Sequence, residues 1–284
     1  MPEYACKVDS CGVSAMVRIG SMVGALLLVC CATLRGQTTP TQAARVPFHE
    51  PLALNFEDHA GFRQIFDGVS LDGWEGDRDY WRVEQGVMVR ESTNERPLSN
   101  TYIWNKGLEV KDFDLRLEIK LDYGGSGIQY RSQVGLPWDR KMRPGEKPRN
   151  LQWMMTGPQA DFYYPYNAQH QQYTGQFYSE NTPLGIVAWR GQMVRMGPGM
   201  PPTVVGSVGD RSELGGWIKV ADWNQYEIIA RGGVMTHIIN GHVMAMLIDD
   251  DPKSSNNAVG KIGIELESTP AKVYVRNIWL RELK

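Results

Sequence analysis

Residues 113–132 read FDLRLEIKLDYGGSGIQYRS, and this stretch decides the fold. Apolar and polar residues alternate strictly in its first half. The apolar positions are Phe113, Leu115, Leu117, Ile119 and Leu121, and the polar positions between them are Asp114, Arg116, Glu118 and Lys120. This period of two predicts a β-strand with one buried and one solvated face. Such a strand is typical of an antiparallel sheet.

The second half of the stretch predicts a turn followed by another strand. Gly124 and Gly125 form the turn, and Gly127, Gln129 and Arg131 then fall on one face of the strand. This face combines a small residue, an amide and a guanidinium, which suits an open polar groove for a hydroxyl-rich ligand. The stretch therefore indicates a β-sandwich that handles sugars.

The rest of the chain extends the same pattern. From about Phe62 onward, short strand patterns alternate with Gly, Pro, Asn and Asp, and no long helical periodicity occurs, which predicts an all-β fold. Residues 84–86 and 240–241 carry hairpin signals. Residues 133–173 are too irregular for strands throughout, and such long loops usually carry function. Residues 193–210 predict a surface insertion, with a lid over the groove as the alternative.

Composition limits the class of partner. The 284 residues include 30 Lys and Arg against 32 Asp and Glu, so the chain has no electrostatic footprint for nucleic acid or an anionic membrane. Nine Trp and twelve Tyr supply aromatic faces of the kind that stack on sugar rings. We expect one β domain with an uncharged carbohydrate partner, and the oligomeric state stays open.

The N-terminal region has the features of an export signal. Residues 22–34 (MVGALLLVCCATL) are apolar but shorter than the ~20 residues of a membrane-spanning helix, and Arg18 precedes them. We predict a cleavable signal peptide within residues 1–36, with Met16 or Met22 as alternative start sites. The mature protein is then periplasmic or extracellular, without stable insertion in the membrane.

All cysteines lie in this predicted signal region. They are Cys6, Cys11, Cys30 and Cys31. The mature protein therefore has no disulfide and no thiol chemistry. Val29 precedes Cys30 where a lipoprotein signal has a small residue, which favours soluble export over lipidation. Residues 37–60 follow as a linker, and residues 61–284 form the predicted domain.

Several ordered motifs together resemble one family. They are FDG at 66–68, LDGW at 71–74, WRVEQGV at 81–87, FDL at 113–115, GIQYR at 127–131 and VRNIWLR at 275–281. On these motifs the chain resembles, over about residues 61–283, the bacterial 3-keto-disaccharide hydrolase domain. The resemblance implies a concanavalin A-like jelly-roll sandwich, export, and cleavage of glycosides whose C3 hydroxyl has been oxidised to a ketone.

The implied chemistry requires three kinds of group. A ketone at C3 acidifies the proton on C2, so a base removes it, the enolate expels the C1 aglycone, and water adds back to give the free 3-keto sugar. The reaction needs a general base near C2, a donor for the enolate oxygen and an acid for the departing oxygen. Histidines and buried carboxylates are the natural acid and base candidates.

Three residues are the catalytic candidates: Asp161, His170 and Glu265. Asp161 shares a face of a short extended segment with Gln159, although a turn residue is the alternative. His170 lies among amides and aromatics, and the alternative is an exposed loop histidine. Glu265 and Glu267 alternate with apolar neighbours and so point to one side, which is either the groove or the solvent. Glu265 is the preferred member because it lies further from the strand end.

The chain lacks the Glu-x-Asp-x-x-Glu cluster of an ordinary sandwich glycosidase, since Gln159 occupies its first position. This argues against a double-displacement mechanism with two carboxylates.

Candidate substrate-binding residues carry amides, guanidinium groups or aromatic rings. They are Gln129, Arg131, Gln159, Tyr173, Trp189 and Arg190. His237 and His242 flank a hairpin turn and are expected at the surface or a sheet edge. Asp161 with His170 is the one candidate pair for a divalent cation, and no local ligand spacing supports it. No metal and no cofactor are predicted.

Three other functions remain open at this point: a non-catalytic carbohydrate-binding module, an ordinary hydrolase of unmodified glycans, and a structural surface domain. Convergence of Arg131, Asp161 and His170 in one groove would favour an enzyme. A shallow aromatic face would favour binding alone.

Overall fold

The computed structural model describes residues 50–135, 151–165, 167, 170–267 and 270–284. The predicted signal region and residues 37–49 of the predicted linker lie outside these residues. Residues 52–284 form one unit. Within the described ranges, no helix is long and apolar enough to cross a membrane.

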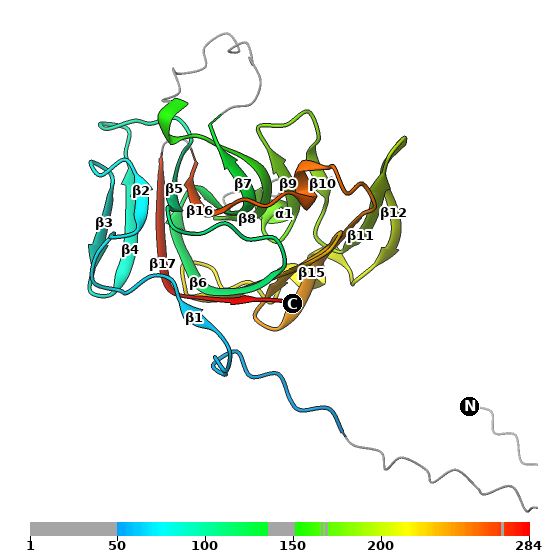
Figure 1. Cartoon of the computed structure of the whole chain (residues 1–284). Helices are drawn as coiled ribbons and strands as arrows, with labels where there is room; N and C mark the ends of the chain where they lie inside the picture. Colours follow the sequence, from blue (N-terminus) through cyan, green and yellow to red (C-terminus); the bar gives the residue numbers. More distant parts are fainter. Residues whose placement is uncertain (1–49, 136–150, 166, 168–169, 268–269) are drawn as a thin grey trace, which may run out of the picture. The chain divides into compact units, whose positions relative to one another are not determined.

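Two β-sheets make up this unit (Figure 1). In spatial order, the large sheet contains β12 (Met200–Ser207), β11 (Gln192–Gly197), β15 (His242–Asp249), β14 (Val234–Ile239), β13 (Asn224–Arg231), β6 (Phe113–Tyr123), β17 (Ala271–Glu282), β4 (Val87–Ser92) and β3 (Trp81–Glu84), and β1 (Arg63–Gln64) pairs with β17. The small sheet contains β10 (Gly185–Ala188), β9 (Phe177–Glu180), β8 (Met155–Tyr163), β7 (Gly125–Val134), β16 (Lys261–Leu266), β5 (Thr101–Asn105) and β2 (Trp74–Gly76).

Helical segments in the described residues are short. They are α1 (His170–Tyr173), α2 (Arg211–Gly215) and the 3-10 turns Leu151–Trp153 and Ser255–Asn257. Strand pairing is antiparallel except between β11 and β15, which run parallel. The predicted all-β, antiparallel jelly-roll sandwich is therefore confirmed.

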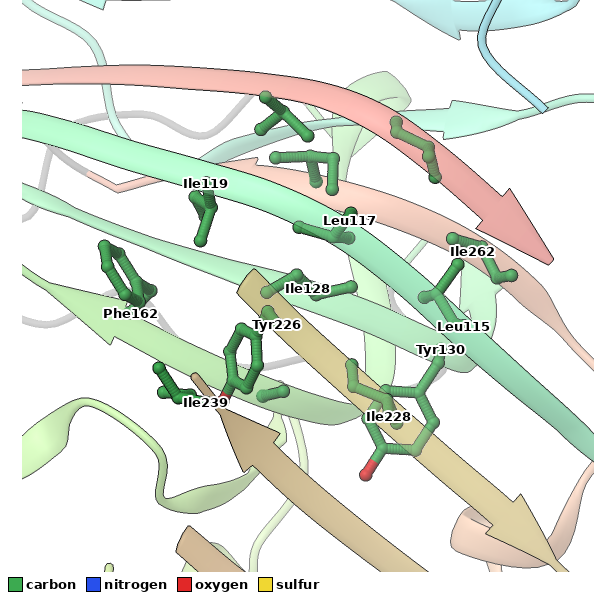
Figure 2. Close-up of a cluster of buried hydrophobic side chains, with 14 of the residues drawn as sticks. Leu115, Leu117, Ile119, Ile128, Tyr130, Phe162, Tyr226, Ile228, Ile239 and Ile262 are labelled. Atoms are coloured by element: carbon green, nitrogen blue, oxygen red, sulfur yellow. The ribbon is translucent and has the colours of Figure 1, made fainter. Parts of the chain in front are cut away.

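The hydrophobic core lies between the sheets, as the alternation in residues 113–121 predicts. Leu115, Leu117 and Ile119 of β6 are buried against Ile128 of β7 and Phe162 of β8 (Figure 2). Burying a side chain of this size contributes about 1.5–3 kcal/mol, so this contact surface is the main source of the fold's stability.

The polar face of β6 departs from the prediction of a solvated face. Asp114 and Arg116 are both buried. Nη1 of Arg116 donates to the carbonyls of Asn55, Phe56 and Asp58 at 3.3, 3.2 and 2.9 Å. One guanidinium has enough N–H donors to bond several chain carbonyls at once. These bonds hold the segment before β1 over this end of the face.

Both predicted hairpin turns are confirmed. Gln85 and Gly86 join β3 to β4 with φ angles of 49° and 83°, and Asn240 and Gly241 join β14 to β15 with 49° and 82°. Two consecutive residues with positive φ match the turn whose twist suits a two-residue hairpin.

Strands occupy parts of two segments in which Pro and Gly interrupt the sequence pattern. Residues 193–210 were expected as a surface insertion or a lid, but β11 and β12 place most of them at the edge of the large sheet. β8 lies inside the segment 133–173, although Pro158 interrupts its sequence pattern. The sheet tolerates Pro158 because it falls where the β7–β8 register is interrupted, between the pairs Gln129–Gln159 and Gln133–Thr156, so no ladder bond from its nitrogen is needed on that side.

Candidate functional site

A cavity of about 680 Å³ lies on the outer face of the small sheet. Its described lining is formed by Asn100, Gln159, Asp161, Tyr163, Tyr173, Gln176, Tyr178, Glu180, Asn181, Thr182, Pro183, Gly185, Ile186, Glu265 and Glu267. Strand alternation explains the set, because Gln159 and Asp161 of β8 face the cavity while Ala160 and Phe162 face the core. The lining is rich in carboxylates, amides and phenols.

One amide joins the two most buried carboxylates of the cavity. Nε2 of Gln159 donates to Oδ1 of Asp161 at 2.7 Å and to Oε2 of Glu265 at 2.8 Å. The two distances together limit the separation of these oxygens to about 5.5 Å. The carboxyl groups are therefore close enough to act on neighbouring atoms of one sugar ring.

The hydrogen bonds from Gln159 to both carboxylates depend on the strand that lies between Asp161 and Glu265. Asp161 lies on β8 and Glu265 on β16, with β7 between them. A Cβ built on Gly127 of β7 would lie 2.4 Å from Cδ of Gln159, so a side chain at this position would occupy the path of the amide. Likewise, a Cβ at Gly125 would lie 2.0 Å from Oε2 of Glu267. The glycines of β7 thus let side chains from the flanking strands meet over it.

Each carboxylate has further donors. Oε1 of Glu265 accepts from Tyr102 Oη at 2.9 Å and from Asn100 Nδ2 at 2.8 Å. Oδ2 of Asp161 accepts from Gln176 Nε2 at 2.5 Å. Glu265 therefore receives three hydrogen bonds and Asp161 receives two, which favours the ionised form of Glu265 over that of Asp161.

Burial shifts the pKa values of these groups upward. Desolvation raises the pKa of Asp161 and of Glu265 well above their ordinary values, and the charges of Glu180 and Glu267 add to the rise. The pKa of Glu267 is also raised by burial, against a hydrogen bond from Tyr163. Because the carboxylates repel one another in a poorly solvated space, the cavity favours retention of at least one proton.

The phenols of the cavity stay protonated. Burial raises the pKa of Tyr163 well above 10, and it raises the pKa of Tyr178 to about 12. Neutral phenols donate a hydrogen bond, so these groups suit an oxygen that develops negative charge.

Four of the nine predicted site residues line the cavity: Asp161, Glu265, Gln159 and Tyr173. Gln129 lies directly behind them, where its Nε2 donates to Oε1 of Gln159 at 2.5 Å. His170 begins α1, which packs against β8, but its side chain lies outside the described residues.

Arg131 does not reach the cavity, contrary to the prediction that it shares a face with Gln129. The register of β7 against β8 shifts by one residue after Gln129, and Arg131 has a φ of 50°. This bulge breaks the two-residue period. The buried guanidinium bonds instead to the carbonyls of Lys111, Gly232 and Asn256 and to Asp112. Arg131 therefore joins three loop segments to β7 and has a structural role.

Arg190 and Trp189 also lie away from the described lining. Arg190 is buried, with Nη1 donating to the carbonyl of Thr174 at 2.8 Å and Nε to that of Arg211 at 2.8 Å. Trp189 stacks on Tyr173 with ring centroids 6.0 Å apart. Trp189 therefore supports a ring of the cavity wall from behind.

The prediction of a surface or edge position is wrong for His237. Its side chain is fully buried, with Nε2 at 2.8 Å from Tyr130 Oη and Nδ1 at 3.1 Å from the carbonyl of Gln176. Burial lowers the pKa of His237 to about 4, so the ring is neutral. His242 is half-buried and stacks on Trp217.

Several lining residues were not among the predicted site residues. Gln176, Tyr178 and Glu180 face the cavity from β9 and the residue before it, whereas Phe177 between them belongs to the hydrophobic core. The alternation in QFYSE was a usable signal. Tyr163 lies on the same face of β8 as Gln159 and Asp161, so the same alternation identifies it. Asn100 carried no such signal, because only the pairing of distant strands brings it to Glu265.

Metal binding finds no support in the described part of the chain, where no group of three or more His, Cys, Asp or Glu side chains is arranged to hold an ion. The prediction that the protein uses no metal stays a prediction.

Three of the solved structures to which this chain is similar are described by their sequence identity, TM-score and coverage. A candidate glycosyl hydrolase from Parabacteroides distasonis shows 18% identity and a TM-score of 0.48, with 78% of this chain and 99% of that chain covered. A carbohydrate-binding module from Bacillus subtilis shows 12% identity and a TM-score of 0.42, with 74% of this chain and 96% of that chain covered. A β-glucanase from Bacillus licheniformis shows 8% identity and a TM-score of 0.43, with 78% of this chain and 97% of that chain covered. At these identities and TM-scores the likenesses carry no functional information.

The family assignment comes from the sequence. No curated protein matches the chain. The model of one family, described as the 3-keto-alpha-glucoside-1,2-lyase-like domain, matches residues 61–281, which confirms the resemblance drawn from the motifs. The chain therefore belongs to this family of carbohydrate-active domains.

Proposed function

We propose that the protein is an exported enzyme that cleaves the glycosidic bond of 3-keto-glycosides. The base removes the C2 proton, the resulting enolate expels the C1 aglycone, and water then adds to give the free 3-keto sugar. The observation that carries this proposal is the pair of buried carboxyl groups, Asp161 and Glu265, joined by Gln159 inside a cavity of sugar-binding size. The apolar segment 22–34 supports export.

Glu265 is the better candidate for the base. Its ionised form accepts hydrogen bonds from Tyr102, Asn100 and Gln159, while burial raises its pKa above the ordinary value. A carboxylate that is ionised yet more basic than usual is suited to proton abstraction.

Asp161 is the better candidate for the acid. Both of its described side-chain hydrogen bonds come from amide donors, Gln159 and Gln176. Neither amide nitrogen accepts a proton, so a proton on Asp161 is available to the departing glycosidic oxygen. Coulombic repulsion from Glu267 and Glu180 favours this protonated form.

Tyr178 is suited to the enolate oxygen. Its pKa of about 12 keeps the phenol protonated, and it lines the same cavity as the two carboxyl groups. A neutral donor that meets the charge as it develops stabilises the transition state more than the ground state.

The test compares two substrates with one aglycone. Purified protein is incubated with p-nitrophenyl 3-keto-glucoside and with unoxidised p-nitrophenyl glucoside. We expect release from the keto substrate alone, with a loss of about 10²- to 10⁴-fold in Glu265→Gln and Asp161→Asn. Glu84→Gln, at an exposed position on β3, is the matched control. Exchange of the C2 proton in D₂O checks the deprotonation step. Sugar binding without release would favour a non-catalytic module.

Direct hydrolysis of unmodified glycans is a second candidate, because the two carboxyl groups share one donor and so lie close together. The limit of about 5.5 Å between the Asp161 and Glu265 oxygens is compatible with the ~5–5.5 Å between the carboxyl groups of retaining glycosidases. Release of the aglycone from the unoxidised glucoside, without exchange at C2, would support this candidate and contradict the elimination.

A further inference from the structure

A second polar cluster lies inside the sandwich, on the core-facing side of β4. Arg90 of β4 has 0% exposed area, and its Nε, Nη1 and Nη2 atoms have no hydrogen-bond partner among the described residues. Neighbouring positions on β4 and β3 carry two more buried groups without a partner, Ser92 Oγ and Trp81 Nε1. The mechanism proposed above uses none of these groups.

The strands place these groups side by side. Trp81 of β3 is directly opposite Arg90 in the antiparallel register, so both side chains project from the same face. Ser92 lies two residues further along β4 and projects from that face as well. The core assignment of Met88 and Val273 shows that this face points between the sheets.

The cluster supplies donors and a positive charge but no acceptor with a full negative charge. Arginine and the tryptophan indole have only donors, and a serine hydroxyl can also donate. The Arg90 guanidinium lies 5.1 Å from the ring centroid of Tyr80 and 5.2 Å from that of Trp81. Ring faces attract a cation by about 2 kcal/mol or more when it is desolvated, but they supply no hydrogen-bond acceptor for the N–H groups in these contacts.

Arg90 carries its charge at neutral pH. Burial lowers its pKa to about 9, against the attraction of Asp77 and Tyr80, so the protonated form still dominates. Removing such an ion from water costs several kcal/mol unless an opposite charge is close. Among the described residues, Arg90 has no hydrogen bond, and Asp77 attracts it without forming an ion pair within 4 Å. Water would satisfy its N–H groups but would not neutralise it.

From this arrangement we infer that Arg90, Trp81 and Ser92 form a buried structural site for a small monovalent anion, such as chloride. Complete burial excludes a bulky organic anion. A dianion such as sulfate is unsuited because one guanidinium would leave a net negative charge in the core. The inference is independent of the proposed enzymatic activity.

The test measures thermal stability against salt identity. Protein in sodium isethionate is titrated with sodium chloride or bromide at constant ionic strength. We expect a saturable rise in Tm, of roughly 5–10 °C when the halide reaches about 100 times its dissociation constant. In Arg90→Met the rise disappears, and in Trp81→Phe, which retains the ring but loses the N–H, the midpoint moves to higher halide concentration.

Arg195→Met is the matched control, because that guanidinium is exposed and pairs with Asp250 at the surface. It retains the halide response. If Arg90→Met does not fold, Trp81→Phe and anomalous scattering from bromide-soaked crystals decide the question. A wild-type Tm that does not depend on halide, or bromide density absent from this cluster, would overturn the inference and leave Arg90 solvated by buried water alone.

Discussion

Gly127 leaves open the space in which the side chain of Gln159 crosses strand β7, since a Cβ at Gly127 would lie 2.4 Å from Cδ of Gln159. The neighbouring atoms of Gln159 are as close, with Nε2 at 2.5 Å and Cγ at 2.6 Å. The arrangement of the two carboxyl groups therefore depends on a residue that has no side chain.

Gly127→Ala is expected to displace the amide of Gln159 from between Asp161 and Glu265. The added methyl meets a side chain rather than the backbone, so the sheet should form while the carboxyl groups lose their shared donor. We expect kcat/KM on a 3-keto-glucoside to fall about 100-fold, the effect of a displacement of about 1 Å in an active site. Gly107→Ala, at an exposed position with no close contact, is the control. Unchanged activity in Gly127→Ala would show that the bridge is dispensable.

Glu265→Gln is expected to make the protein more stable relative to wild type as the pH rises. The pKa of Glu265 is raised in the folded state, so wild type has its greatest relative stability below the unfolded value of 4.5 and loses it as pH rises through the folded value. Urea denaturation from about pH 5 to about pH 8 should therefore show a difference in unfolding free energy that widens with pH. A constant difference would mean that Glu265 is not desolvated.

Arg131→Met is expected to damage the fold and not the chemistry. The guanidinium bonds to three chain carbonyls and to Asp112, and its loss removes this donor from the carbonyls and leaves Asp112 with the Gly232 N–H. We expect a loss of roughly 3 kcal/mol in the free energy of unfolding. The KM and kcat of the folded fraction should stay at wild-type values. A raised KM with normal stability would instead support the role in substrate binding predicted from the sequence.

His237 is expected to destabilise the protein in acid. Its pKa falls from 6.5 to about 4 in the folded state, so its contribution to stability is complete above pH 6.5 and is lost as the pH falls toward 4. The difference corresponds to roughly 3 kcal/mol across this window. Urea denaturation of His237→Gln should show a flatter pH dependence there. Equal slopes in His237→Gln and wild type would contradict a buried neutral ring.

The candidate site shows which side-chain positions strand alternation predicts and where it fails. The pattern at 113–121 correctly identified the core face of β6, and the pairs Gln159 with Asp161 and Glu265 with Glu267 were correctly assigned to common faces. Alternation is readable from sequence because successive side chains of a strand point to opposite sides. It fails at Arg131, where a bulge with positive φ turns the side chain away.

Sequence by itself determined the all-β class, the hairpin turns and the family, because these depend on local periodicity, on residues that tolerate positive φ and on ordered motifs. Only the tertiary structure decided that Asp161 and Glu265 share one amide, that Arg131 is structural and that His237 is buried. These features depend on which strands become neighbours across 100 residues or more of chain, as in the bond between Gln159 and Glu265. Neighbours of this kind are set by the pairing order of the sheets, which no local pattern encodes.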